Sequence, residues 1–122
     1  MLIMFHPPPE DVVDYLGSEP ERVCVMQGVC IENPHVVVVT DYIPVANSSS
    51  SPELTFEVRK RDLRGIDYIV GFMHSHEESL PDPSPADLLG LPLGTVGAVW
   101  CAGAIEWYTP SGAAPIDGVI SR

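Results

Sequence analysis

The sequence is poor in basic residues. Six Lys and Arg stand against seventeen Asp and Glu among 122 residues, which gives a formal net charge of −11 with neutral histidines. A surface this negative repels the phosphate backbone of nucleic acids and the headgroups of anionic lipids. We therefore expect neither nucleic acid nor a membrane surface as a partner.

Cysteines and long apolar runs are also scarce. Cys24, Cys30 and Cys101 form no CxxC pair and cannot all be bridged, which favours a reducing compartment and predicts buried free thiols. No apolar run approaches the roughly 20 residues of a membrane helix. The first residues, MLIMFHPPPE, lack the cationic flank of a signal peptide, so we expect a cytoplasmic protein.

The remaining composition predicts one α/β domain over residues 1–122. The chain is 45% hydrophobic and long enough to bury a core of its own. A short helix is expected to begin at Glu10 and Asp11 and to end at Gly17, with Val12, Val13 and Leu16 on one face. Apolar and β-branched runs predict an edge strand at 1–5, a strand pair at 22–31 and 35–45, a central strand ending at 76, a hairpin around Ala102 and Gly103, and a tail at 111–122.

Several other residues have simpler expectations. The serine-rich segment 46–53 has nothing to bury and predicts a mobile surface loop. His6 and His35 have no partners at ligand spacing and are assigned to surface or turn positions. Trp100 and Trp107 flank the expected hairpin and are assigned to packing.

Two histidines, His74 and His76, end the expected central strand. Side chains alternate along a strand, so both imidazoles point to one face while Ser75 points to the other. Such a pair can hold one metal ion, and a catalytic zinc usually takes three protein ligands and a water. The residues alone leave the third ligand open; the nearby acids are Glu77, Glu78, Asp82 and Asp87. The alternative is an ordinary, partly buried histidine pair at a strand end.

The segment Ser84-Pro85-Ala86-Asp87 follows this pair. It predicts a helix with Ser84 as N-cap and Pro85 at its first position. Asp87 could then reach back to the cap as in a capping box, although Glu or Gln is the usual residue there. This segment alone therefore favours a helix start over a metal ligand.

The two segments together resemble the signature of the JAMM, or MPN+, metallopeptidase family. Its pattern of His-Ser/Thr-His, seven residues, Ser, two residues and Asp is matched by His74, Ser75, His76, Ser84 and Asp87. The family also has a distant glutamate after a proline and seven residues before a glycine. Glu21 has that position, after Pro20 and seven before Gly28, and Glu19 is the nearby rival. The similarity extends over roughly residues 10–108.

The resemblance implies an MPN-like α/β fold of layered α+β type, with a mixed, mostly antiparallel sheet flanked by short helices, as in cytidine deaminases. It implies one zinc ion per chain held by His74, His76 and Asp87, with water as the fourth ligand. Glu21 would be the general base, Ser84 would stabilise the oxyanion, and Ser75 would support the ligands.

The implied activity is hydrolysis of peptide or isopeptide bonds, as in deubiquitinases. The expected substrate is the C-terminal tail of a ubiquitin-like or sulfur-carrier protein, and a homodimer is left open. Three alternatives remain: a peptidase of cell-wall peptides, a non-catalytic scaffold that binds proteins, and a structural zinc domain whose fourth ligand is Glu77 or a cysteine.

One departure from the family concerns the loop after the histidines. Glu77 stands where a proline is common, and Glu78 and Asp82 make the loop acidic. Such a loop would repel an acidic substrate tail or favour a basic residue near the scissile bond. A solvated loop is the simpler interpretation.

Overall fold

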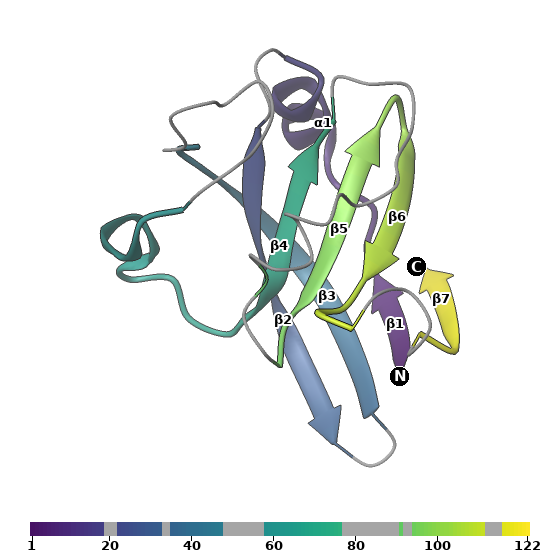
Figure 1. Ribbon diagram of the computed structural model, residues 1–122. Coiled ribbons are helices and arrows are strands. Elements are labelled where there is room, and N and C mark those ends of the chain that lie inside the picture. Colours follow the sequence, from purple (N-terminus) through teal and green to yellow (C-terminus); the bar gives the residue numbers. More distant parts are fainter. Residues whose placement is uncertain (19–21, 33–34, 48–57, 77–90, 92–93, 112–115) are drawn as a thin grey trace.

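Seven strands of the described residues lie in one sheet in the order β6-β5-β4-β2-β3-β1-β7 (Figure 1). The computed structural model describes residues 1–18, 22–32, 35–47, 58–76, 91, 94–111 and 116–122. The elements are β1 (Leu2–Phe5), α1 (Glu10–Leu16), β2 (Val23–Glu32), β3 (His35–Val45), the 3₁₀ helix η1 (Lys60–Leu63), β4 (Ile69–Ser75), β5 (Val96–Cys101), β6 (Ala104–Tyr108) and β7 (Gly118–Ser121).

The sheet is mixed, as expected. β2 pairs antiparallel with β3 and β4, and β5 pairs antiparallel with β6. The β4–β5, β1–β3 and β1–β7 pairs are parallel. The longest pairing joins β2 to β3, so the predicted strand pair is confirmed, and β4 is the predicted central strand. The hairpin between β5 and β6 turns at Ala102 and Gly103, which both have positive φ.

The predictions for the two ends of the chain are wrong. β1 is not an edge strand, because it lies between β3 and β7 and is parallel to both. The segment expected as a tail contains β7, which forms the edge beside β1. The amino group of Met1 contacts the carboxylate of Asp117, and Figure 1 shows the first strand, β1, and the last strand, β7, side by side. Because β7 has four residues and is mostly exposed, its apolar pattern is too short to be recognised in the sequence.

The core has two parts, on opposite faces of the sheet. Met73 belongs to the first and its neighbour Phe72 to the second, as alternation along a strand requires. The helix α1 adds Val12 and Leu16 to the first part. The buried residues of the second part are Val25, Phe72, Leu91, Val99 and Tyr108. His74 therefore points to the second face, away from α1.

The cysteine prediction holds for two thiols and fails for the third. Cys24 and Cys101 are buried, whereas Cys30 is exposed. The reason is that the pairing of β2 with β4 ends at Gln27, so that the outer part of β2 pairs with β3 alone. Figure 1 shows β2 and β3 reaching beyond β4, and Val29 and Ile31 are exposed there as well.

Two smaller expectations are settled by the described residues. Trp107 is buried and Trp100 packs against the first core, so both serve packing as predicted. His6 is exposed, also as predicted, whereas the side chain of His35 and most of the serine-rich segment lie outside the described part. Within that part, no helix has the length and apolar character to cross a membrane.

Candidate metal centre

The histidine pair stands at the end of the central strand β4. His74 is fully buried and lies between Val23 of β2 and Val99 of β5. His76 follows the strand, and its backbone N–H donates to the carbonyl of Trp100 at 3.1 Å. Hydrogen bonding to the sheet thus fixes the backbone of both histidines.

The two imidazoles converge. Their Nε2 atoms are 3.1 Å apart, and the rings meet edge to face with centroids 5.0 Å apart. Two nitrogens at about 2.0–2.1 Å from one tetrahedral zinc would be roughly 3.3–3.4 Å apart. The same distance suits a hydrogen bond when one Nε2 carries the proton. The two Nε2 atoms are therefore spaced to bind one zinc ion with little movement. Without a metal, the two rings can form a hydrogen bond with each other.

An aromatic side chain borders the pair on the same face of the sheet. The ring of Tyr108, on β6, lies edge-on to His74 with centroids 6.4 Å apart. Phe72 and Val99 are buried on this face too. These neighbours keep bulk water from the strand side of the imidazoles.

Ser75 lies on the opposite face and is buried. Its hydroxyl accepts a hydrogen bond from the backbone N–H of Arg22 at 2.8 Å, and its own N–H donates to the carbonyl of Arg22 at 2.9 Å. Ser75, which lies between the two histidines in the sequence, thus ties the end of β4 to the start of β2. Sequence reasoning assigned Ser75 a supporting role but missed Arg22, for which no local pattern gives a signal.

Tyr15 of α1 strengthens this corner of the fold. Its hydroxyl donates to the carbonyl of Val45 at 2.8 Å, and the guanidinium carbon of Arg22 is 5.5 Å from the centre of its ring. Burial raises the pKa of Tyr15 above 10.0, so the hydroxyl keeps its proton for this hydrogen bond. The start of β2 is therefore held by both α1 and β4.

The structure describes only part of the predicted site. It brings His74 and His76 together and places Ser75 behind them. Glu21, Ser84 and Asp87 lie outside the described residues, as do the rival Glu19 and the acids Glu77, Glu78 and Asp82. In the part of the chain that is described, no three His, Cys, Asp or Glu side chains form a group suited to a metal ion. The completeness of the ligand set stays a prediction.

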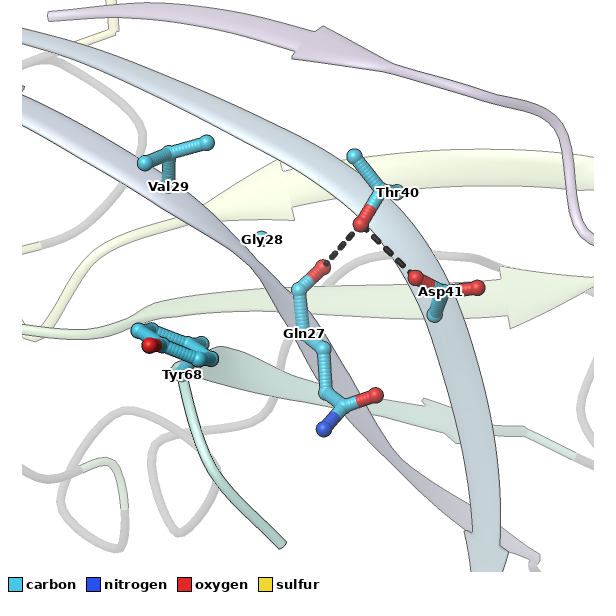
Figure 2. A pocket seen from close by; sticks show the side chains of 6 residues that line it. All are labelled: Gln27, Gly28, Val29, Thr40, Asp41 and Tyr68. Atoms are coloured by element: carbon cyan, nitrogen blue, oxygen red, sulfur yellow. Dashed lines mark hydrogen bonds between the residues drawn. The ribbon is translucent and has the colours of Figure 1, made fainter.

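A separate pocket lies near the outer half of β2. Its volume is about 300 Å³. Figure 2 shows its lining, which comprises Gln27, Gly28, Val29, Thr40, Asp41 and Tyr68. Irregular pairing at Gln27 and Gly28 shapes this pocket, and the hydroxyl of Thr40 donates to Asp41 at 2.9 Å. The histidines lie beside the other end of β2, so this pocket is distinct from the candidate centre.

Known proteins resemble this chain in sequence and in fold. A scan against models of protein families found no match. A desampylase of Haloferax volcanii is 34% identical over 79 residues, which cover 58% of this chain and 55% of that protein. The match thus spans about half the length of this relative.

Solved structures share the fold over most of the chain. A structure described as the JAMM metalloprotease-like zinc site of the proteasome and signalosome has a TM-score of 0.54 at 16% identity, covering 92% of this chain and 91% of that one. A JAB1/MPN domain protein of Archaeoglobus fulgidus has a TM-score of 0.50 at 15% identity, with 84% and 81% covered. A protein of Desulfitobacterium hafniense has a TM-score of 0.65 at 16% identity, with 100% and 93% covered. The resemblance indicated by the motif is therefore confirmed: this chain has the fold of the JAMM/MPN domain proteins.

Proposed function

We propose that this protein is a zinc-dependent hydrolase of peptide or isopeptide bonds at the C-terminal tail of a ubiquitin-like or sulfur-carrier protein. The observation that carries the proposal is the 3.1 Å approach of the His74 and His76 Nε2 atoms, within a motif that also supplies Ser84 and Asp87 at family spacing. The desampylase relative and the JAMM/MPN fold support the same activity.

The proposed roles follow from the chemistry of each side chain. His74, His76 and Asp87 would hold one zinc ion. When bound, zinc lowers the pKa of a water ligand towards about 7 and polarises a carbonyl oxygen. Glu21 would accept a proton from the attacking water and return it to the departing amine. The Ser84 hydroxyl would donate a hydrogen bond to the oxygen on which negative charge develops.

The anchor at Ser75 supports the role proposed for Glu21. Arg22, the next residue in the sequence, is bonded through its backbone to the residue between the two histidines. Consecutive Cα atoms are 3.8 Å apart across a trans peptide, so the chain enters β2 next to the histidine pair. The carboxylate of Glu21, one residue before Arg22, is therefore a better candidate for the general base than that of Glu19, which comes two residues earlier.

Cleavage and metal content test this function together. The purified protein is incubated with fusions that end in Gly-Gly followed by a leaving group, with and without a chelator. We expect zinc-dependent cleavage and about one zinc per chain by elemental analysis. Absence of zinc after supplementation, or cleavage that a chelator leaves unchanged, would contradict the proposal.

Three variants separate the roles. Glu21→Ala should keep zinc and lose cleavage, whereas His76→Ala should lose both. His6→Ala is the matched control, because His6 is exposed and has no proposed role. Loss of zinc in Glu21→Ala would make Glu21 a ligand and overturn its assignment as base.

The alternatives give different results in the same assays. A scaffold would bind proteins but cleave none of the fusions. A structural zinc domain would keep zinc without cleavage, since its fourth ligand position is closed. Cleavage of cell-wall peptides in place of the Gly-Gly fusions would identify the other peptidase class. We also propose that residues 1–122 act as one domain in the cytoplasm, which the absence of a CxxC pair in the sequence suits.

A further inference from the structure

Most of the few basic residues are gathered in one short segment. Residues 59–64, here named the basic turn, contain Arg59, Lys60, Arg61 and Arg64, four of the six Lys and Arg of the chain. All four are exposed. With Asp62 the basic turn carries +3, so the other 116 residues carry −14. The protein thus presents one positive segment on an otherwise strongly negative chain.

The basic turn is fixed to the sheet by its apolar neighbours. Leu63 within it, and Val58 and Ile66 on either side, pack against the second core part. The N–H of Asp62 donates to the carbonyl of Arg59 at 2.9 Å and closes the turn. The second core part is on the face that carries His74. The four cations are therefore held on the histidine side of the sheet, and Figure 1 shows η1 standing out from the strands beside β2 and β4.

The cations of the basic turn are not neutralised by the described acids. Within the part of the chain that the structure describes, no ion pair joins any of the four to an Asp or Glu. Four like charges within six residues repel one another. Although the chain has seventeen Asp and Glu, the four cations form no ion pair with the described acids. The segment therefore leaves its positive charge available to another molecule.

We infer that the basic turn is a docking surface for an acidic face of the protein whose tail is cleaved. The substrate identity rests on the proposed function. An acidic protein is repelled by most of this chain and attracted by the basic turn, so it would approach with the turn against its acidic face and its tail towards the histidine side. Nucleic acid is the less favoured partner, because the remaining −14 repels a long phosphate backbone.

Binding measured without cleavage tests this inference directly. The probe is a ubiquitin-like protein with an acidic sheet face and a C-terminal Gly-Gly, beside a version whose surface acids are replaced by amides. Binding to the Glu21→Ala protein is measured at about 50 mM salt. We expect Arg61→Glu, added to this background, to weaken binding of the acidic probe about threefold to tenfold. Binding of the amide version should be weak and insensitive to the substitution.

Arg122→Glu is the matched control. Arg122 is also exposed, follows β7 at the sheet edge, and undergoes the same charge reversal, so it should leave binding within about twofold. In the active protein, Arg61→Glu should raise KM for the protein substrate and leave kcat unchanged. Cleavage of a short peptide with the same tail should be unaffected, because the peptide has no acidic face.

The outcomes separate this inference from the proposed function. Equal effects of Arg61→Glu and Arg122→Glu on binding would overturn the docking surface, even if the tail is cleaved. Binding that depends on the basic turn, in a protein that cleaves no fusion, would leave the surface standing and refute the hydrolase. A labelled oligonucleotide that binds through Arg61 more tightly than the acidic probe would also overturn the inference.

Discussion

Ser75 separates the two histidines and joins β4 to the start of β2. Its side chain is buried and its hydroxyl accepts the backbone N–H of Arg22. In Ser75→Ala this donor loses its acceptor, so we expect the free energy of unfolding to fall by about 1–3 kcal/mol. Urea denaturation measures the change.

Ser121→Ala provides the comparison for Ser75. Ser121 is exposed in the short edge strand β7, and its substitution should change stability by less than about 0.5 kcal/mol. Equal losses in the two variants would show that the Ser75 hydroxyl does not stabilise the junction. Zinc binding should persist in Ser75→Ala, because both imidazoles remain.

Cys24 makes stability depend on pH. Burial raises the pKa of its thiol from 9.0 to about 12. The unfolded state therefore loses the proton first, so the stability from a neutral, buried Cys24 is fully present below pH 9 and declines towards pH 12. The decline is at most about 4 kcal/mol.

The exposed thiol supplies the control for this pH dependence. Unfolding free energies measured from pH 8 to 11 should fall less steeply for Cys24→Ala than for the wild type. Cys30→Ala removes an exposed thiol and should keep the wild-type slope. If Cys24→Ala leaves the slope unchanged, the loss of stability at alkaline pH comes from other groups.

The convergence of the histidines could be predicted because it depends on local geometry. His74 and His76 end one strand with a single residue between them, and alternation on a strand puts both on one side. The contact between Ser75 and Arg22 could not be predicted. The partners are 53 positions apart in the sequence, and nothing in either segment indicates how the two strands pair. Family resemblance suggested a role for Ser75, and the structure supplied its partner.

Among the elements, β2 depends on a glycine at the irregular point of its pairing with β3. A Cβ on Gly28 would overlap the carbonyl oxygen of Val38 and would be 3.1 Å from the Cα of Val39. Both are backbone atoms of the adjacent strand and cannot rotate away. We expect Gly28→Ala to lower the free energy of unfolding by about 3 kcal/mol or more, measured by urea denaturation.

Gly17→Ala is the matched glycine control. Gly17 caps α1 with φ −76°, and a Cβ there meets its nearest atom, the carbonyl oxygen of Val13, at 3.4 Å. The variant should be as stable as the wild type or up to about 1 kcal/mol more stable. A tolerated Gly28→Ala would mean that β2 and β3 can separate locally at this point of their pairing.

Most elements were predictable from their apolar patterns, but the strand β7 and the sheet positions of the two terminal strands were not. The β2–β3 pair has ten and eleven residues rich in Val, and the helix α1 begins at the predicted acids. β7 has four residues, and its partner β1 lies at the opposite end of the sequence. Because parallel pairing between distant segments leaves no local trace, the positions of β1 and β7 in the sheet came only from the structure.

The whole molecule carries its charge unevenly, with −14 outside the basic turn. Repulsion among these acids opposes the compact state, and dissolved salt screens it, since the Debye length falls from about 30 Å at 0.01 M to about 8 Å at 0.15 M. We therefore expect the melting temperature to rise between these salt concentrations at pH 7. A gain of about 1 kcal/mol would correspond to roughly 4 °C for a chain of this size.

Lowering the net charge provides the control for the salt effect. At pH 5.5 the net charge is closer to zero, which is reached near the pI of 4.4, so the same salt step should produce a smaller rise. A melting temperature that falls with salt at pH 7 would show that attractive ion pairs outweigh the repulsion. The same salt step should weaken docking at the basic turn, because screening acts on attraction between molecules as it does on repulsion within one. Opposite responses of stability and docking to one change in salt would therefore follow from a single charge distribution.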